Sequence, residues 1–377
     1  MRLTIALALC SSLLLACSGQ AQDAPAQPAS SAKPFQTATV ADFDAPWAMT
    51  FLPDGRMLVT ERKGELLLVA ADGKSRKPLA GTPQVDSAGQ GGLMDVVLHP
   101  KFAQNRLVYL SFSEAGPGGK GVALARGTLE DGDRPRLADL QVIFRASPYV
   151  EGDGHYSGRI AFSPDGYLFF TNGDRQKFDP AQDPKATLGK VLRLNDDGTP
   201  AAGNPLAAQG FHPAVWSYGH RNLLGIAFDA KGNLWEQEMG PKHGDELNLV
   251  LQARNYGYPK ASNGNHYDGR DIPDHKPGDG FEAPKVWWNP AISPAGLMIY
   301  SGKLWPNWNG DVFIGGMNTP GLVRVDVQGT NAQKGDFWDM GGQRVREVEE
   351  GPDGAIYVLE DGTRGSQGRL IKLTPAR

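Results

Sequence analysis

Short apolar segments and polar turns alternate through most of the chain. A pair of apolar segments joined by a turn recurs six times, for example in AMTFLPDGRMLVTER (48–62) and RIAFSPDGYLFFTNGD (159–174). Asp-Gly, Asn-Gly and Lys-Gly pairs at such turns allow the positive φ angles that tight hairpins require. Each pair therefore predicts a β-hairpin, and no stretch has the convincing period of an amphipathic helix. The six turns lie at Asp54, Asn105, Asp165, Lys231, Asn309 and Asp353.

Most hairpins are followed by a further apolar segment, such as GELLLVAADG (64–73). Successive turns lie roughly 45–80 residues apart, a spacing typical of propeller blades with their loops. One blade cannot bury both of its faces, whereas six blades in a ring can. The pattern predicts an all-β fold, a six-bladed β-propeller of four-stranded antiparallel blades over residues 35–377, with segment 35–43 completing the last blade. The alternatives are a β-sandwich array or two all-β domains, but no linker-like break interrupts the region.

The first 34 residues resemble a targeting segment followed by a tether. Arg2 precedes an apolar run that is too short to span a bilayer, which needs about 20 residues. The run ends in LLAC, which resembles a bacterial lipobox, so residues 1–16 are predicted to be a lipoprotein signal peptide and Cys17 the lipidated residue. Residues 17–34 are rich in Ala, Pro, Ser and Gln and predict a disordered tether. We expect a lipid-anchored protein of the bacterial cell envelope, facing the periplasm. A plain secretory peptide is the alternative.

The composition and the positions of the polar loops narrow the range of possible functions. The formal net charge of −4 gives no indication of nucleic-acid binding, which requires a basic face. Cys10 leaves with the signal peptide, so no pair of cysteines remains for a structural disulfide. Four polar loops each precede the inner strand of a predicted blade, so we expect them to open onto one face around the central channel. These loops are SAGQGGLMD (87–95), GDGHYSGR (152–159), SYGHRNLLG (217–225) and GGQRVREV (341–348).

Seven stretches along the domain carry a family resemblance. They are GQGGLMDVVLHPKF (89–102), HYSGRIAFSPDGYLFFTNGD (155–174), QDPKATLGKVLRLNDDGTP (182–200), SYGHRNLLGIAFD (217–229), MGPKHGDELNLV (239–250), NYGYP (255–259) and QRVREVEEGPDGAIYVLED (343–361). In these stretches, and in their order, the chain resembles the soluble quinoprotein glucose/sorbosone dehydrogenase family, particularly its aldose sugar dehydrogenases. The resemblance implies a dehydrogenase that uses pyrroloquinoline quinone (PQQ) and calcium to oxidise aldoses at the anomeric carbon to the lactone.

Sugar oxidation removes a proton from oxygen and a hydride from carbon. The proton requires a base that titrates near neutrality, and the resemblance assigns this role to His155. The hydride acceptor becomes negative, and the resemblance assigns the stabilising cation to Arg221. PQQ carries three carboxylates, which favour arginine partners. Arg344 and Arg346 alternate in sequence, so we expect both to point to one side. The cofactor contacts implied by the resemblance are Gln90, Arg221, Asn222, Tyr267, Gly316, Met317, Asn318, Arg344, Val345 and Arg346.

The resemblance also implies two calcium sites. Calcium takes oxygen ligands, and the first site is assigned to the consecutive backbone carbonyls of Gly240 and Pro241. Proline restricts itself and the residue before it, so these carbonyls are preset. The second site is assigned to Glu246 and Tyr256. For this second site, a buried acid that ties a loop is the alternative.

The chain departs from the family at Asn318, where relatives carry a lysine near the cofactor carboxylates. The lost charge keeps a non-catalytic binding propeller open as one alternative. A calcium-dependent propeller lactonase is another, but its chemistry needs several carboxylates and asparagines on one metal, whereas this chain offers paired arginines and a loop histidine. The expected partners are an aldose substrate and a soluble or membrane electron acceptor, with the protein itself a monomer or weak dimer.

Overall fold

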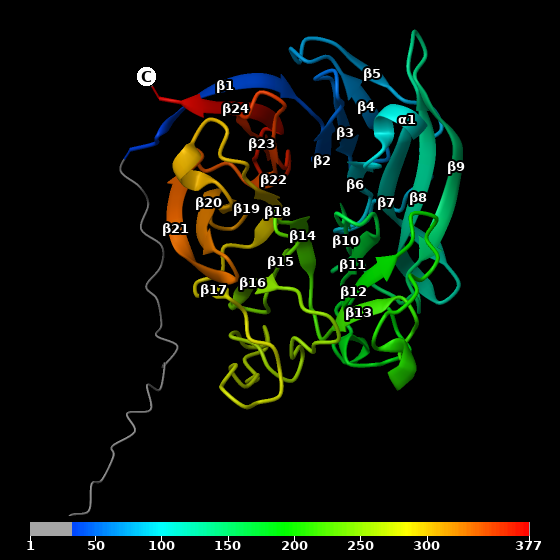
Figure 1. Cartoon of the computed structure of the whole chain (residues 1–377), viewed down its shortest axis with the longest axis vertical. Helices are drawn as coiled ribbons and strands as arrows, with labels where there is room; N and C mark the ends of the chain where they lie inside the picture. Colours follow the sequence, from blue (N-terminus) through cyan, green and yellow to red (C-terminus); the bar gives the residue numbers. More distant parts are fainter. Residues whose placement is uncertain (1–31, 377) are drawn as a thin grey trace, which may run out of the picture.

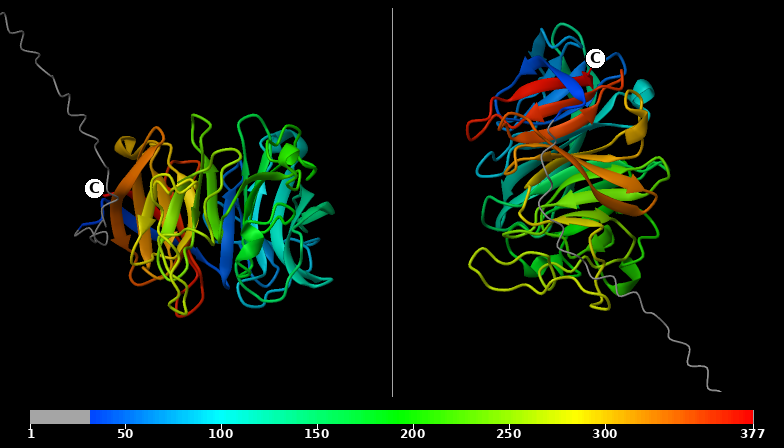
Figure 2. Two further views of the ribbon diagram at one scale, coloured as in Figure 1. Left: turned by 90° about the horizontal axis from the view of Figure 1, so that it is seen from below. Right: turned by 90° about the vertical axis from the view of Figure 1, so that its left-hand side faces the viewer.

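The computed structural model describes residues 32–376, whose sheets form a ring (Figures 1 and 2). The predicted signal peptide, the lipid attachment at Cys17 and most of the tether lie outside the described residues. Among the described residues, no helix is both long enough and apolar enough to cross a membrane.

The fold is a six-bladed β-propeller, as the hairpin pattern predicts, and every blade is a four-stranded antiparallel sheet. The only helices within residues 32–376 are single turns: α1 (Phe102–Asn105) and the 3₁₀ turns Asp179–Ala181, Ala207–Gln209 and Pro306–Trp308. The blades, in chain order, are β2 (Pro46–Phe51), β3 (Met57–Glu61), β4 (Leu66–Val69), β5 (Arg76–Pro78); β6 (Leu93–Leu98), β7 (Leu107–Gly116), β8 (Gly119–Glu130), β9 (Arg136–Arg145); β10 (Ser157–Phe162), β11 (Leu168–Asn172), β12 (Lys190–Leu194), β13 (Val215–Tyr218); β14 (Leu223–Phe228), β15 (Leu234–Glu238), β16 (Asp245–Leu249), β17 (Val286–Trp288); β18 (Pro294–Ile299), β19 (Val312–Gly316), β20 (Gly321–Gln328), β21 (Asn331–Asp339); and β22 (Val345–Glu350), β23 (Ile356–Glu360), β24 (Arg369–Pro375), β1 (Phe35–Asp42).

The ring is closed by the first strand of the described chain. β1 pairs antiparallel with β24, from Phe35 opposite Pro375 to Asp42 opposite Arg369. The Phe35 ring also packs edge-on against Trp338 of the preceding blade, with 5.4 Å between the ring centroids. Segment 35–43 therefore completes the last blade, as predicted from the sequence.

Packing between blades explains why second strands are buried along their whole length. All five residues of β3, β11 and β23 are buried, because neighbouring blades cover both faces of these strands. Each buried Val, Leu, Ile or Phe contributes roughly 1.5–3 kcal/mol relative to an exposed position. The stability of the fold therefore comes from contacts between neighbouring blades. A β-sandwich array would not bury these strands in the same way.

A register shift recurs in the innermost strand of every blade. In β2, Trp47 falls between two paired residues and has no partner on β3. Leu224 and Arg346 occupy the same position in β14 and β22. Shifts of the same kind occur in β6, β10 and β18. An unpaired residue of this kind bends the strand and redirects its side chain. The shifts lie near the start of each innermost strand, which is where the polar loops enter the strands.

A buried ionic cluster closes the channel beneath these shifts. Arg159 donates hydrogen bonds to carboxylate oxygens of Asp95 and Glu347, and its Nε donates to the Leu224 carbonyl at 2.7 Å. Its guanidinium lies over the Trp47 ring, 4.2 Å from the centroid. These contacts connect the innermost strands β2, β6, β10, β14 and β22 and form a floor for the space above.

Candidate active site

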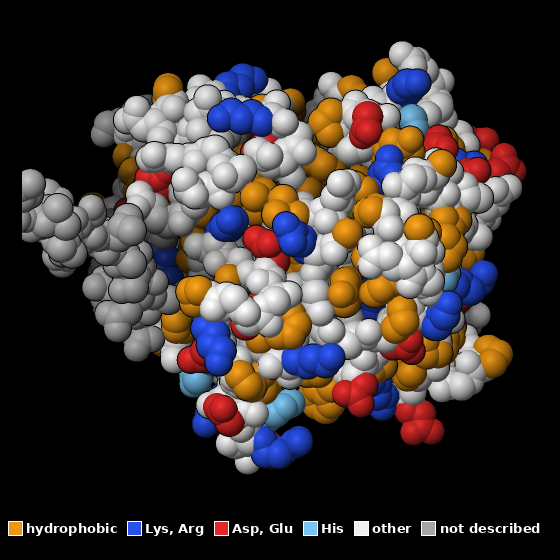
Figure 3. All heavy atoms as spheres, turned by 60° about the horizontal axis from the view of Figure 1, so that its bottom comes forward, with side chains coloured by type: hydrophobic (Ala, Val, Ile, Leu, Met, Phe, Trp, Pro, Cys, Tyr) orange, Lys and Arg blue, Asp and Glu red, His pale blue; other side chains and the backbone are white. Residues whose placement is uncertain are grey.

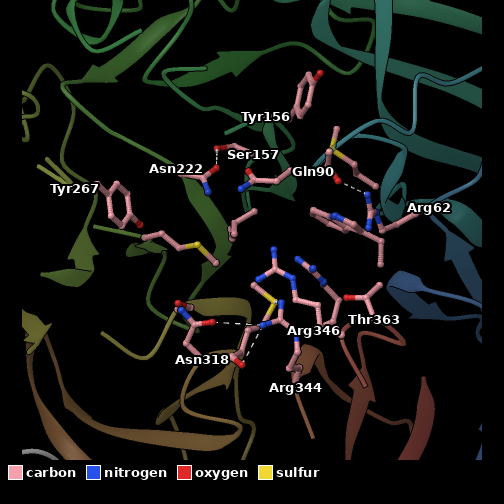
Figure 4. Close-up of a pocket in the computed structure, with 18 residues that line it drawn as sticks. Arg62, Gln90, Tyr156, Ser157, Asn222, Tyr267, Asn318, Arg344, Arg346 and Thr363 are labelled. Carbon is pink, nitrogen blue, oxygen red and sulfur yellow. Dashed lines mark hydrogen bonds between the residues drawn. The ribbon is translucent and has the colours of Figure 1, made fainter. Parts of the chain in front are cut away.

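A cavity of about 240 Å³ opens at one end of the central channel (Figure 4). Every blade contributes to its lining, so it depends on closure of the whole ring. The lining contains four arginines and no Asp or Glu side chain, which makes it strongly electropositive. The lining residues are Trp47, Arg62, Gly89, Gln90, Met94, Tyr156, Ser157, Asn222, Leu224, Met239, Tyr267, Ser293, Met317, Asn318, Arg344, Arg346, Thr363 and Arg364.

Two of the four arginines share one buried carboxylate. Arg344 Nε lies 2.7 Å from Asp361 Oδ2, and Arg346 Nη2 lies 3.6 Å from the same oxygen. Arg344 also donates to the Met317 carbonyl at 3.2 Å. Arg346 Nε is buried without a hydrogen-bond partner. Burial, together with the neighbouring arginines Arg344, Arg62 and Arg159, lowers the Arg346 pKa to about 10 despite Asp361. The protein thus holds excess positive charge at the cavity wall.

His155 lies just behind the cavity lining, in the loop that enters β10. Its Nδ1 lies 2.6 Å from Asp174 Oδ1, and its backbone N–H donates to Gln90 Oε1 at 2.7 Å. Because the Asp174 carboxylate accepts a hydrogen bond from Nδ1–H, the proton of the neutral ring lies on Nδ1 and Nε2 is the nitrogen left with a lone pair. Burial lowers the His155 pKa, Arg221 lowers it further, and Asp174 opposes both effects. The ring is therefore kept neutral and ready to accept a proton.

The backbone around His155 is strained. His155 has φ = 50° and Ser157 has φ = 61°, and in the facing loop Arg175 has φ = 56° and Phe178 has φ = 63°. Non-glycine residues with positive φ persist only where surrounding contacts hold them, and they gather at functional sites. Asp174 supplies such contacts, since its carboxylate also accepts the backbone N–H groups of residues 176 and 178.

Arg175 holds the histidine loop from the other side. Its guanidinium lies over the Tyr156 ring, 3.7 Å from the centroid, and donates to the carbonyls of Gly152 and Gly154. The side chain is almost completely buried. Its role is therefore to fix the loop that presents His155, and it does not line the cavity.

Arg221 lies beside the cavity, behind Tyr267. Its Nη1 donates to the carbonyls of Met239 at 2.8 Å and Gly240 at 2.5 Å, while Nε has no partner. The guanidinium is 5.9 Å from the Tyr267 ring centroid. Tyr267 itself is 74% exposed, so it forms the rim of the cavity.

The four residues assigned to calcium lie together in the blade of β14 to β17. Gly240 and Pro241 are buried, and the Gly240 carbonyl faces the Arg221 guanidinium. Glu246 lies next to Asn248 within a fully buried polar cluster. The Tyr256 hydroxyl donates to the Leu249 carbonyl and accepts from an N–H group, so its oxygen is already engaged.

The cluster around Glu246 has unsatisfied oxygen atoms. One ligand atom each of His220, Glu236 and Glu238 lies within 4.8 Å of the others. Glu236 Oε2 and Asn248 Oδ1 are buried without hydrogen-bond partners. Burial disfavours a charged His220, but Glu236 and Glu238 outweigh that effect and raise its pKa to about 9, so His220 supplies one positive charge. The remaining buried carboxylate and amide oxygens are of the kind that a hard cation takes as ligands. Sequence reasoning found Glu246 and missed the residues from the adjacent strand β15.

The structure brings most of the predicted cofactor residues to one cavity: Gln90, Asn222, Tyr267, Met317, Asn318, Arg344 and Arg346 all line it. Gly316 and Val345 do not, and the Val345 side chain is packed in the hydrophobic core between two blades. Arg344 and Arg346 do lie on one side, but Arg346 is the unpaired residue of a register shift, so simple alternation is not the reason. Sequence reasoning missed Arg62, Arg364 and Asp174, although Asp174 ends the matched stretch HYSGRIAFSPDGYLFFTNGD.

Comparison with known proteins places this geometry in a family. A family model described as Glucose / Sorbosone dehydrogenase matches residues 43–372. The chain belongs to the glucose/sorbosone dehydrogenase family. Among curated members, it is 40% identical over 340 residues to an aldose sugar dehydrogenase of Escherichia coli, covering 88% of this chain and 90% of that protein.

Solved structures of the family share the fold over nearly the whole chain. The crystal structure of the E. coli soluble aldose sugar dehydrogenase in its apo-form has a TM-score of 0.85 and 38% identity, covering 91% of this chain and 100% of that one. The PQQ-bound aldose sugar dehydrogenase of Streptomyces coelicolor has a TM-score of 0.76 and 29% identity, covering 93% and 99% of the two chains.

Proposed function

We propose that the protein is a quinoprotein that oxidises aldose sugars to lactones with PQQ as its cofactor. The observation that carries the proposal is the cavity wall of four arginines with one buried carboxylate, Asp361, behind them. A ligand with three carboxylates fits such a wall, because each guanidinium can donate two hydrogen bonds to a carboxylate. The family membership and the PQQ-bound relative support the same assignment.

His155 and Asp174 supply the acid–base chemistry. Nε2 of His155 accepts the proton of the anomeric hydroxyl, and Asp174 holds the ring in the required tautomer and stabilises the cation that forms. When bound, PQQ supplies the quinone that takes the hydride from the anomeric carbon. Arg221 places a fixed positive charge beside the cavity, where it stabilises the negative charge that develops on the acceptor. Loss of one proton and one hydride converts the sugar to its lactone.

We assign calcium to two places in the blade of β14 to β17. The backbone carbonyls of Gly240 and Pro241 would hold the first ion. Binding there would require Arg221 to give up its hydrogen bond to the Gly240 carbonyl. The unsatisfied oxygens beside Glu246 would hold the second ion, and the acids Glu236 and Glu238 add charge there. Tyr256 contributes packing, with its ring stacked on His220 at 4.5 Å between centroids.

The calcium-lactonase alternative is disfavoured by the cavity itself. Such an enzyme needs side-chain carboxylates converging on a metal in the channel, and the lining residues include none. On the face that Figure 3 shows, basic and acidic side chains are interspersed. The electron acceptor is proposed to be a soluble or membrane carrier that approaches the exposed rim at Tyr267, and the protein to act as a monomer or weak dimer.

We further propose export to the cell envelope with a lipid anchor at Cys17, on the strength of the LLAC motif. Cell fractionation tests this point. The wild-type protein should sediment with membranes, and a Cys17→Ser variant should be released in soluble form.

The experiment for the activity uses the purified apo-protein with PQQ, calcium and a redox dye. Reduction of the dye with glucose, and none when PQQ is omitted, is the expected result. Dye reduction that is independent of PQQ would contradict the proposal, as would lactone hydrolysis by the apo-protein with calcium alone. Tight PQQ binding without turnover of any aldose would instead identify a non-catalytic binding propeller.

A further inference from the structure

Two arginines of the cavity have no acidic partner. Arg62, in the turn between β3 and β4, donates only to the carbonyls of Gly89 at 2.5 Å and Gly91 at 3.2 Å. Arg364, in the loop between β23 and β24, is exposed, and the described residues give it no hydrogen bond or ion pair. Neither arginine belongs to the pair expected from the sequence.

The one carboxylate behind the wall is not available to them. Asp361 Oδ2 takes Arg344 at 2.7 Å and the Thr363 hydroxyl at 3.0 Å, and Oδ1 accepts the Thr363 N–H at 2.8 Å. Asp361 is fully buried, so its position is fixed. Asp361 forms its ion pairs with Arg344 and Arg346, and neither Arg62 nor Arg364 has an ion pair with it or with another described acid.

The two charges are close enough to affect each other. Burial lowers the Arg62 pKa, Asp361 opposes that effect, and the charge of Arg364 makes a smaller contribution that lowers the pKa again. Like charges held together without a counter-ion destabilise the folded protein, and a bound anion removes that cost.

The backbone also holds Arg364 in place. The residue has φ = 52°, a value that is uncommon outside glycine, and it follows Thr363, which Asp361 anchors through two hydrogen bonds. Arg364 is exposed and lines the cavity, so a ligand in the cavity can reach its side chain. Strain retained at a cavity rim points to a ligand contact.

We propose that Arg62 and Arg364 form a second carboxylate clamp for the cofactor, which supplies the positive charge that this chain lacks at Asn318. This inference rests on the proposed PQQ-dependent function. Figure 4 shows Arg62 and Asn318 on opposite sides of the cavity, with Arg344 and Arg346 between them. Compared with relatives that carry a lysine at the position of Asn318, this chain would place the corresponding positive charge on the opposite side of the cavity. The cavity would therefore stay electropositive without that lysine.

The test is a PQQ titration of the apo-protein with saturating calcium, followed by quenching of tryptophan fluorescence, at low and high salt. Arg364→Ala should weaken PQQ binding by roughly 10- to 100-fold, the worth of a charge-assisted hydrogen bond. The salt dependence of binding should become weaker, because one attracting charge is lost. Arg364→Lys should keep the salt dependence and recover part of the affinity.

Arg136→Ala is the matched control. It removes the same charge from the outermost strand β9, where Arg136 pairs only with Glu130, and should leave PQQ affinity unchanged. Arg62→Lys provides a second variant that keeps the charge but loses the paired donors to the Gly89 and Gly91 carbonyls. It should weaken binding less than Arg62→Ala does.

The outcomes separate the two proposals. If the wild-type protein does not bind PQQ, the proposed function fails. If it binds PQQ and Arg364→Ala binds with the same affinity and salt dependence, the clamp is refuted while the function stands. An equal loss of PQQ affinity in Arg364→Ala and Arg136→Ala would also refute the clamp, because the change in the net charge of the protein would then explain the effect.

Discussion

Nδ1 of His155 lies 2.6 Å from Oδ1 of Asp174, and both side chains are buried beside an electropositive cavity. This contact determines which nitrogen of the ring can accept a proton. It also opposes the two influences, burial and Arg221, that lower the His155 pKa. The pair therefore sets both the geometry and the pH range of the proposed proton transfer.

Asp174→Asn should lower kcat by roughly 10²- to 10⁴-fold, since an amide cannot hold the ring in the same tautomer or stabilise its cation. Asp174 raises the His155 pKa, so its removal lowers that pKa further. The acidic limb of the kcat/KM profile should accordingly move to lower pH. Rate measurements across pH check both effects. An unchanged limb would mean that another group is the base.

Arg221→Met should shift the acidic limb of the kcat/KM profile to higher pH, opposite to the effect of Asp174→Asn. Arg221 lowers the His155 pKa, so loss of its charge raises that pKa and the activity should fall off at a higher pH than in the wild type. We expect kcat to fall by about 10²- to 10³-fold, because the cation that stabilises the acceptor is gone. Arg136→Met, on an outer strand, is the control and should show the wild-type profile.

Arg159→Met tests the floor of the cavity. The variant leaves the carboxyl groups of Asp95 and Glu347 buried without their cation, which should cost about 3–5 kcal/mol of unfolding free energy. Urea denaturation measures this loss. Arg145→Met removes an exposed ion pair with Glu114 and should cost less than about 1 kcal/mol. Equal losses in the two variants would show that the buried cluster has no special role.

Calcium at the second site should stabilise the fold. An ion present at 100 times its Kd adds about 2.7 kcal/mol, so EGTA should lower the melting temperature of the wild type. Glu246→Gln removes one of the mutually repelling carboxylates. The variant should melt higher than the wild type in EGTA and should respond less to calcium. The same calcium response in both proteins would exclude Glu246 as a ligand.

The hairpin pattern predicted the propeller and its closure because turn residues and apolar segments are local features that repeat. The register shifts were not predictable, since the sequence around Trp47 or Arg346 does not reveal how many residues the partner strand contributes. Those shifts decide which side chains face the cavity. Alternation along the sequence is therefore not enough to explain why Arg344 and Arg346 line the same cavity.

The missed site residues have a common physical cause. Arg62 follows a strand of the first blade and Arg364 lies in a loop of the last, and only closure of the ring brings them together. In the sequence each is one charged residue near a turn, which usually lies in solvent. Asp174 is a different case, because it is the last residue of a matched stretch. Only the three-dimensional structure shows that it contacts His155.

Closure of the ring by β1 and β24 has a consequence for the order in which the protein matures. Within residues 32–376 the first strand pairs with the last, and the cavity takes residues from every blade, from Trp47 to Arg364. A partly synthesised chain therefore lacks the arginine wall of the last blade, Arg344, Arg346 and Arg364. Under the proposed function, PQQ would bind in full only to the complete propeller, unlike in open repeat arrays, where each added unit docks on its neighbour alone.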